Sequence, residues 1–267
     1  MTGARVDYIF CINTGRCGSN YLYEIFSKVD DCIAVHEPEP ICHKQPMRDF
    51  LSGNDQPMRS LMPAKIAQIE RTRGGSQYIE TNHCFIKGFG WFIPEHIPQE
   101  QIGIVILRRE KSKVVDSLWR IGTTPLTKRG RDWLIEPRRK NPILSPPSLW
   151  WNPAYTLAAM RLLALPYRSK QWCQHLRLAV PGWIERYEKQ VLGWYVDETY
   201  ALGEAYQKKF PRIRYYPVTV EELNDPAKVK DMLDFFGTRY STGIEEIIGR
   251  PTNLKIADRK ATQGAMQ

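Results

Sequence analysis

The sequence lacks the cysteine patterns that mark disulfide frameworks and zinc sites. Its six cysteines form no C-x-x-C pair, and no cysteines and histidines cluster at the spacing of zinc ligands. Unpaired cysteines are typical of proteins from reducing compartments, so we expect reduced thiols. No cluster of aspartate and glutamate suggests a bound cation either. These absences predict a protein without disulfides and without a metal.

The sequence also lacks long hydrophobic runs. None approaches the roughly 20 residues that a membrane-spanning helix needs, so no transmembrane segment is expected. The opening residues, MTGARVDYIFCIN, hold one arginine and a short apolar run with no small-residue cleavage site after it. This pattern is typical of a strand and not of a signal peptide. The expected protein is therefore soluble and cytoplasmic.

Positive charge is what the sequence has in excess. Its 38 lysine and arginine residues outnumber its 29 aspartate and glutamate residues, which gives a formal net charge of +9. A basic protein favours anionic ligands or partners, and both nucleic acid and a small polyphosphate fit that balance. No RNP, zinc-finger or helix-turn-helix signature accompanies the charge. We therefore expect a small anionic ligand and no nucleic-acid partner.

Segments of two kinds alternate along the chain. Runs rich in β-branched and aromatic residues, typical of strands, lie at 6–13, 32–35, 78–89, 103–107 and 213–218. Segments with helical periodicity lie at 19–29, 47–75, 111–120, 155–165, 184–209 and 220–236. This alternation predicts an α/β fold with a central parallel sheet flanked by helices. The length and the absence of repeats favour one domain over residues 1–267.

One stretch, around residues 123–155, has weak periodicity and is rich in proline, basic residues and tryptophan. It predicts an insertion that reaches over a site. Five tryptophans in and after this stretch either stack on a sugar ring or flat apolar group, or pack in the core. They are Trp133, Trp150, Trp151, Trp183 and Trp194.

The segment INTGRCGSNYLYEIF carries the first expected strand into a loop with two glycines and an arginine. A strand, a glycine loop and a helix in this order bring backbone N–H donors and the positive helix end to one point. Gly15 and Gly18 allow tight turns, and Arg16 offers forked donors to phosphate or sulfate oxygens. Ser19 or Asn20 is expected to cap the helix. The Gly-Lys-Ser/Thr ending of nucleotide-hydrolysing P-loops is missing, so we expect an anion other than ATP; a plain tight turn is the alternative.

The segment IVILRREKSKVVDSLWR places Arg109 at the end of an expected strand and Ser117 on the second turn of the next helix. Together with the glycine loop, this arrangement resembles the sulfotransferases that use 3'-phosphoadenosine 5'-phosphosulfate (PAPS). In that family a Lys/Arg-Ser-Gly-Ser/Thr-Ser/Thr loop binds the 5'-phosphosulfate, and a later Arg-x7-Ser binds the 3'-phosphate. The resemblance implies a P-loop-like fold with PAPS as cosubstrate. The contact residues that it implies are Arg16, Cys17, Gly18, Ser19, Asn20, Tyr21, Arg109 and Ser117.

Weaker likenesses and some departures accompany these elements. VHEPEP resembles the Glu-Pro segment of carbohydrate sulfotransferases and their bacterial relatives, and YYPVTVEELNDPAKVKDMLDFFG resembles a late strand–helix segment of the family. Cys17 stands where the family often has serine, and Asn20 where it usually has a hydroxyl. Both leave a cradle of main-chain N–H groups intact. The family's late Arg-Lys-Gly element is not visible, and Arg259 and Lys260 either replace it or belong to a solvated tail.

The resemblance implies that a sulfuryl group moves from PAPS to a hydroxyl or amine by in-line displacement, without a metal. Alignment and stabilisation of charge on the leaving oxygen supply much of the catalysis in such a transfer. Arg16 and the loop N–H groups are expected to stabilise that charge. The acceptor pocket is expected around residues 123–155, and a saccharide, a glycolipid headgroup or a small secondary metabolite all remain open as acceptors. The sequence carries no signal of oligomeric state.

Sulfuryl transfer also needs a base for the proton of the acceptor. Glu37 is the expected base, because it follows a short strand whose end opens onto the cleft and because the Glu-Pro pattern favours it. Pro38 predicts an extended backbone at Glu37. The alternatives are His36 and Glu39 in the same loop, followed by Glu80 and His83.

Two further residues carry open alternatives. Cys17, beside Arg16 and a helix N-terminus, is either a reactive thiolate in the cradle or a buried, inert thiol. Lys87 is expected to share one face of a strand with Phe85 and Phe89. It either lines the cleft or extends from a half-buried strand toward solvent.

Two other classes of function compete with the sulfotransferase. A P-loop nucleotide kinase would explain the glycine loop, but it needs the missing Gly-Lys-Ser/Thr and a strand that ends in a magnesium aspartate. A non-catalytic nucleic-acid-binding protein would explain the charge and the basic, tryptophan-rich stretch at 128–151. It would leave Arg109 and Ser117 without a role.

Overall fold

The computed structural model describes residues 4–137, 139–147, 182–240, 245 and 248, with side chains from residue 185 onward in the third of these ranges. Some expectations concern other residues and lie outside this description. They are the helix at 155–165, the part of the insertion beyond residue 147, Trp150, Trp151, the side chain of Trp183, and the pair Arg259 and Lys260.

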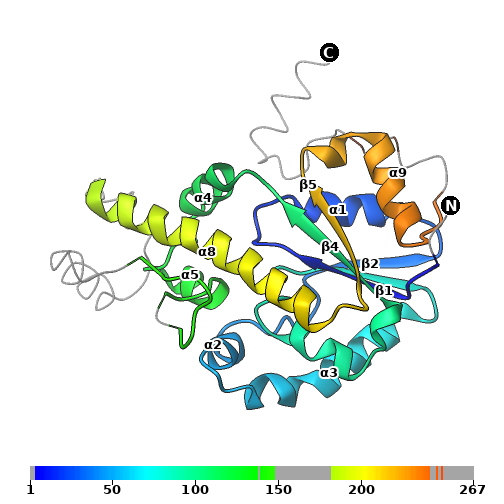
Figure 1. The fold of residues 1–267 in the computed structure, drawn as a ribbon, viewed down its shortest axis with the longest axis horizontal. Helices are drawn as coiled ribbons and strands as arrows, with labels where there is room; N and C mark the ends of the chain where they lie inside the picture. Colours follow the sequence, from blue (N-terminus) through cyan, green and yellow to red (C-terminus); the bar gives the residue numbers. More distant parts are fainter. Residues whose placement is uncertain (1–3, 138, 148–181, 241–244, 246–247, 249–267) are drawn as a thin grey trace.

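Five strands form one sheet in the order β2-β3-β1-β4-β5 (Figure 1). Their bounds are β1 (Tyr8–Ile12), β2 (Cys32–His36), β3 (Gln77–Thr81), β4 (Ile102–Arg108) and β5 (Arg214–Thr219). Neighbouring strands pair in parallel throughout. β1 and β3 are buried along their whole length, as expected for a parallel sheet that is covered on both faces. The predicted α/β fold with a central parallel sheet and flanking helices is confirmed.

Helices connect and cover the strands. They are α1 (Ser19–Phe26), α2 (Gln45–Leu51), α3 (Gln56–Arg73), α4 (Lys111–Arg120), α5 (Lys128–Trp133), α8 (Gly182–Lys209) and α9 (Pro226–Phe235). Short 3-10 turns lie at η1 (Phe89–Trp91), η2 (Ile93–Glu95), η3 (Gln99–Gln101) and η4 (Glu222–Asn224). Figure 1 shows α1 and α9 on one side of the sheet and α3 on the other.

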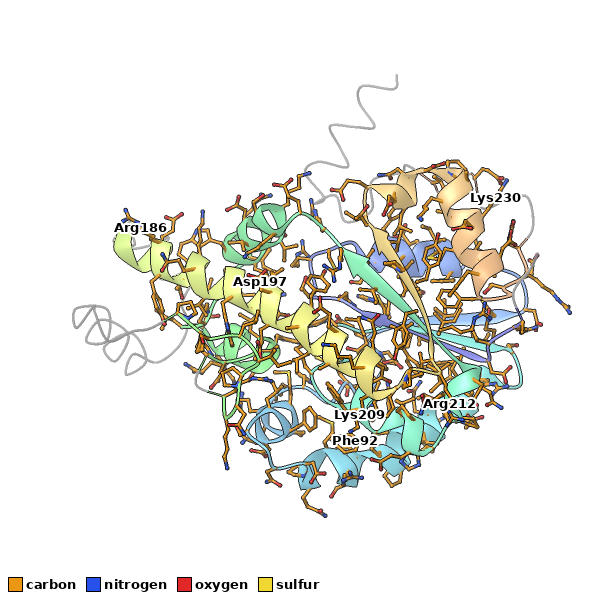
Figure 2. All side chains as sticks on the ribbon, viewed as in Figure 1. Phe92, Arg186, Asp197, Lys209, Arg212 and Lys230 are labelled. Carbon is orange, nitrogen blue, oxygen red and sulfur yellow. The ribbon has the colours of Figure 1, made fainter. Side chains whose placement is uncertain are left out.

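The core lies between the sheet and these helices, where side chains fill the space between the layers (Figure 2). In α1, Leu22, Ile25 and Phe26 have no exposed surface, and their spacing places them on one helix face. Elsewhere in the core, Tyr206 of α8 packs edge-on against Phe85 with ring centroids 5.6 Å apart. Helix α8 also contacts the sheet directly, because the Tyr200 hydroxyl donates to the Leu107 carbonyl at 2.8 Å.

The strand predicted at 78–89 is too long. β3 ends at Thr81, and Asn82 then turns the chain because its Oδ1 accepts a hydrogen bond from the Cys84 N–H at 2.8 Å. Lys87 therefore lies in the turns that follow β3 and not on a strand. The expectation that Lys87 shares a strand face with Phe85 and Phe89 was wrong.

Candidate active site

A cleft of about 850 Å³ opens at the edge of the sheet where the strands end. Its walls come from the loop after β1, the end of β2, the turn after β3, the length of α4, α5, one residue of α8, and the turn after β5. Because parallel strands carry their carboxyl ends to the same edge, segments far apart in sequence meet here. Of the residues predicted for the site, those that line the cleft are Arg16, Gly18, Ser19, Asn20, Tyr21, His36, Glu37, His83, Arg109 and Ser117.

The loop after β1 has a tightly wound backbone. Gly15, Arg16 and Gly18 have φ angles of 71°, 58° and 99°, a left-handed conformation that is costly for arginine. A Cβ on Gly18 would lie 2.5 Å from Cγ2 of Val220, so glycine is required there for space as well as for conformation. Gly18 is the N-cap of α1 and no side chain caps the helix, so the expected cap at Ser19 or Asn20 was wrong.

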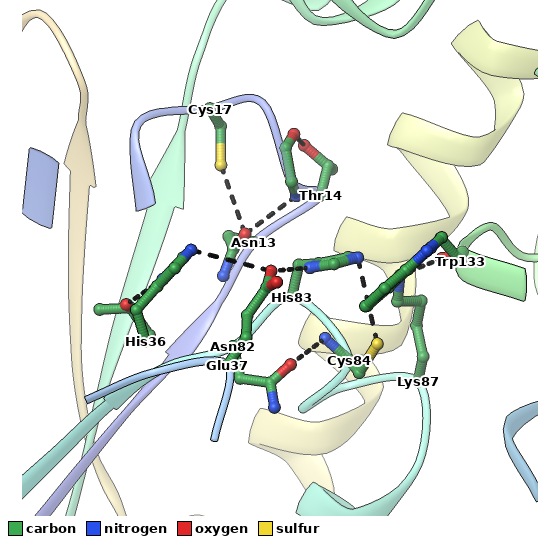
Figure 3. A network of polar contacts seen from close by, with 12 residues as sticks. Asn13, Thr14, Cys17, His36, Glu37, Asn82, His83, Cys84, Lys87 and Trp133 are labelled. Carbon is green, nitrogen blue, oxygen red and sulfur yellow. Dashed lines mark hydrogen bonds and ion pairs between the residues drawn. The ribbon is translucent and has the colours of Figure 1, made fainter. Parts of the chain in front are cut away.

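Asn13 stabilises this loop through its side chain, a role that was not predicted from the sequence. Its side chain is fully buried, and its Oδ1 accepts a hydrogen bond from the Gly15 N–H at 2.9 Å (Figure 3). The Cys17 thiol lies 3.6 Å from the same oxygen. An asparagine directly after a buried strand is the sequence signal that points to such a brace.

Cys17 does not present its side chain to the cleft. The thiol is fully buried, and burial raises its pKa to about 11, so a reactive thiolate is not favoured. Of the two alternatives, the structure agrees with the buried, inert thiol. Cys17 is also not among the residues that line the cleft, so its predicted contact with the nucleotide is not seen in this structure.

Hydrogen bonds join the two predicted nucleotide-binding elements. Arg16 Nε donates to Ser117 Oγ at 3.0 Å, across 101 positions of sequence, and Arg109 Nη1 donates to the Arg16 carbonyl at 3.0 Å. Arg109 follows β4 directly, and Ser117 lies on the second turn of α4. The Nε of Arg109 is buried and has no hydrogen-bond partner among the described residues. This wall therefore offers several cationic donors to one region of the cleft.

Glu37 lines the same cleft and contacts His83. Its Oε1 is 2.5 Å from His83 Nδ1, and Figure 3 shows this pair beside His36. The backbone of Glu37 has a φ of 48°, so the extended conformation expected before Pro38 was wrong. A left-handed glutamate is strained, and such strain persists where the surrounding contacts hold it. His36 contacts both Thr81 and the pair, because its Nδ1 lies 2.8 Å from Thr81 Oγ1 and its Nε2 lies 4.0 Å from Glu37 Oε1.

The protonation of this pair follows from its surroundings. Burial raises the pKa of Glu37, but the hydrogen bond from His83 and nearby cationic groups outweigh burial and hold that pKa at about 2. Burial lowers the pKa of His83 to about 4, and the charge of Lys87 acts in the same direction. At neutral pH, Glu37 is therefore a carboxylate and His83 a neutral imidazole that donates its Nδ1–H. Since His83 has the higher pKa, it takes up a proton before Glu37 does.

The other carboxylates considered as bases do not line the cleft. Glu39 is exposed, and its Oε2 accepts a hydrogen bond from the Ile41 N–H at 3.1 Å. Glu80 is fully buried and forms an ion pair with Lys65 at 2.8 Å. His83 is thus the alternative base that the structure brings beside Glu37.

Lys87 stabilises the cleft wall through buried hydrogen bonds. It is fully buried, and its Nζ donates to the Trp133 carbonyl at 2.5 Å and to the Tyr195 hydroxyl at 3.2 Å. Tyr195 in turn donates to the Thr14 carbonyl at 2.6 Å. Lys87 neither lines the cleft nor extends toward solvent, so both of its expected positions were wrong.

Two of the predicted tryptophans have contrasting environments. Trp133 lines the cleft, with its ring centroid 5.0 Å from that of His83 and 4.4 Å from that of His43. Trp194 is buried, and its Nε1 donates to the Leu144 carbonyl at 3.0 Å. Trp133 therefore lies in the cleft wall with its ring against two histidines, whereas Trp194 belongs to the core.

No group of three or more His, Cys, Asp and Glu side chains gathers at metal-binding distance in the part of the chain that the structure describes. No helix within that part is both long and apolar enough to span a bilayer.

Comparisons with known proteins give a likeness of structure but not of sequence family. No protein-family model matches the chain, and no curated protein matches its sequence. Among solved structures, the chain is similar to a sulfotransferase from Alicyclobacillus acidocaldarius, at 18% sequence identity and a TM-score of 0.44. That match covers 98% of this chain and 91% of the other.

Proposed function

We propose that this protein is a sulfotransferase that moves a sulfuryl group from PAPS to a hydroxyl or amine of its acceptor. The observation that carries the proposal is the hydrogen bond of 3.0 Å between Arg16 and Ser117. It joins the two elements that resemble the nucleotide-binding elements of PAPS-dependent enzymes. Both elements line the same cleft as a Glu37–His83 pair that can accept a proton.

The residues present fit the 5'-phosphosulfate end of this nucleotide. Gly15 and Gly18 keep the loop backbone free of side chains, and the N-terminus of α1 begins directly after it. Arg16 adds a guanidinium group at the same place. The loop would hold the phosphosulfate through its N–H groups, while Arg16 would stabilise the negative charge that develops on the leaving 5'-phosphate oxygen.

The Glu37–His83 pair would serve the acceptor. As the bond from the acceptor oxygen or nitrogen to sulfur forms, the bond from sulfur to the 5'-phosphate oxygen breaks, and the acceptor proton passes to His83 Nε2. His83 can take it there because Nδ1 keeps its hydrogen on the Glu37 side. The other contact of Nε2 is with the Cys84 thiol at 4.0 Å, and a thiol is only a weak donor that the acceptor proton would displace. The carboxylate of Glu37 then stabilises the imidazolium. In this account Glu37 positions and supports the base, and His83 is the base.

The proposal also covers the chemical class of the acceptor. The ring of Trp133 beside His83 favours an acceptor with a sugar ring or another flat apolar face. Saccharides, glycolipid headgroups and small secondary metabolites are the classes to try.

A transfer assay tests the proposal. The protein is incubated with PAPS and pooled acceptors of each class, and release of adenosine 3',5'-bisphosphate and of a sulfated product is measured. We expect both products to appear and to be lost in Arg16→Ala, which should still fold because the side chain of Arg16 lies in the cleft wall. Unchanged turnover in Arg16→Ala would remove Arg16 from the mechanism.

A further inference from the structure

Two arginines line the cleft in addition to Arg16 of the loop after β1 and Arg109 after β4. Arg120 is the last residue of α4, three positions after Ser117, so the two side chains lie on neighbouring turns of one helix face. Arg129 lies on α5, four positions before Trp133. Both arginines line the cleft, and neither belongs to a motif in the sequence.

Each acidic residue of the cleft wall contacts a basic residue other than the wall's arginines. Glu37 contacts His83 at 2.5 Å, Asp116 pairs with Lys189 at 3.1 Å, and Glu221 pairs with Lys113 at 3.5 Å; these are the wall's three carboxylates. Within the described part of the chain, no acidic side chain forms an ion pair with any of the four arginines of the wall. These are Arg16, Arg109, Arg120 and Arg129.

The guanidinium groups of Arg109, Arg120 and Arg129 each repel that of Arg16. Burial lowers the pKa of Arg16, and the charges of Arg129, Arg109 and Arg120 add to that effect in this order. Arg109 also has its buried Nε without a hydrogen-bond partner among the described residues. Arg16, Arg120 and Arg129 are exposed, so solvent screens part of this repulsion. No carboxylate of the wall neutralises the four charges, so a multiply charged anion placed among them would be attracted to all four.

We propose that Arg120 and Arg129 bind a phosphate monoester together with Arg109 and Ser117. This assignment rests on the proposed function, in which that group is the 3'-phosphate of PAPS. A phosphate monoester carries nearly two negative charges at neutral pH and has three acceptor oxygens, so several forked donors can share it. A single carboxylate on an acceptor would satisfy fewer of them. The position of Arg120 one turn from Ser117 places the group on the Ser117 side of the cleft.

Calorimetric titration tests the assignment with two nucleotides that differ only in this phosphate. Adenosine 3',5'-bisphosphate and adenosine 5'-phosphate are titrated into the wild type, Arg129→Gln, Arg129→Lys and Arg120→Gln. Arg131→Gln is the matched control, because it removes the same charge from the same helix at a residue outside the cleft wall. Circular dichroism checks that each variant is folded.

We expect Arg129→Gln and Arg120→Gln to weaken binding of the bisphosphate by about tenfold or more, and binding of the 5'-phosphate by less than about threefold. Arg129→Lys should bind the bisphosphate with an affinity between those of the wild type and Arg129→Gln. Arg131→Gln should match the wild type. Equal losses for both nucleotides, or no loss in the folded Arg129→Gln, would overturn the assignment. A raised KM for the acceptor with unchanged bisphosphate affinity would also overturn it. Failure of the wild type to bind the bisphosphate would instead refute the proposed function.

Discussion

The hydrogen bond from His83 Nδ1 to Glu37 Oε1, at 2.5 Å, determines how the cleft can accept a proton. It holds the imidazole in the tautomer with a hydrogen on Nδ1, so that Nε2, 4.0 Å from the Cys84 thiol, carries the lone pair. The contact depends on the left-handed backbone of Glu37, with φ of 48°, and on the turn after β3 that carries His83. Neither feature follows from a local pattern, because proline after Glu37 favours an extended backbone. The residue types of the pair were readable in the sequence, but the contact between them was not.

Substitution of either partner should slow transfer without weakening nucleotide binding. We expect Glu37→Gln and His83→Gln each to lower kcat by roughly 100-fold or more, because each removes part of the proton-accepting pair. Glu39→Gln is the control, since Glu39 belongs to the same loop but is exposed and does not line the cleft. Steady-state kinetics and bisphosphate titration measure both quantities. Full activity in Glu37→Gln and His83→Gln would mean that the base lies elsewhere.

The ionisation of His83 can be measured directly in the free protein. Because burial lowers its pKa to about 4, the imidazole should remain neutral as the pH falls from 8 to about 5 and gain its proton only near pH 4. An NMR titration of the histidine side chains gives this midpoint. In the folded state below that midpoint, His83 can no longer accept a proton. A midpoint at or above the ordinary histidine value of about 6.5 would contradict the account.

At the scale of elements, the predictions from the sequence fail at turns and at buried polar contacts. The strand after α3 was expected to continue to residue 89, yet β3 ends at Thr81. Asn82 turns the chain, and Glu80 binds Lys65 of α3, 15 positions earlier. Lys87 finds its partners in α5 and α8, up to 108 positions away. Alternation of residue types predicts strands, but it carries no information on such distant polar partners.

The buried Lys65–Glu80 pair should make a large contribution to stability when one partner is removed. Lys65→Met leaves the carboxylate of Glu80 buried without its cation, which costs about 3–5 kcal/mol of unfolding free energy. The double variant Lys65→Met/Glu80→Gln should recover part of this loss, because the remaining amide is uncharged. Urea unfolding measures all three proteins. A loss below about 1 kcal/mol in Lys65→Met would show that the pair is not desolvated as described.

The glycine loop allows a matched test of space against backbone strain. Gly15→Ala and Gly18→Ala both force alanine into a left-handed backbone, at a cost of about 1–3 kcal/mol. Only the Gly18 substitution also places a Cβ within 2.5 Å of Val220, whereas the new Cβ at Gly15 has ordinary contacts at 3.5 Å. We expect Gly18→Ala to be the less stable variant and to bind the bisphosphate more weakly.

Thermal unfolding and nucleotide titration compare these two variants with Gly18→Ala/Val220→Ala. The double variant removes the clashing side chain and should regain the part of the loss that comes from crowding, but not the part that comes from strain. Equal effects of the two glycine substitutions would show that Val220 moves aside freely.

At the scale of the whole molecule, the parallel sheet explains why the site exists. The order β2-β3-β1-β4-β5 carries the loop after β1 next to the start of α4, and the ends of β2 and β3 next to each other. Alternating strands and helices in the sequence predicted this class of fold, and the strand-end positions of Arg16 and Arg109 predicted that they face one edge. Their binding roles stay predictions. Arg120 and Arg129 were not foreseen, because a basic residue on a short helix has no signature before the tertiary fold places it.

A comparison of ligand affinities tests the central claim most directly, because it needs no knowledge of the acceptor. Adenosine 3',5'-bisphosphate, ATP with magnesium, and short DNA and RNA duplexes are titrated into the wild type and into Arg109→Ala. We predict that the bisphosphate binds most tightly and that Arg109→Ala weakens it by at least about tenfold. Tighter binding of ATP with magnesium, or of either duplex, would contradict the sulfotransferase and favour the kinase or the nucleic-acid-binding protein in its place.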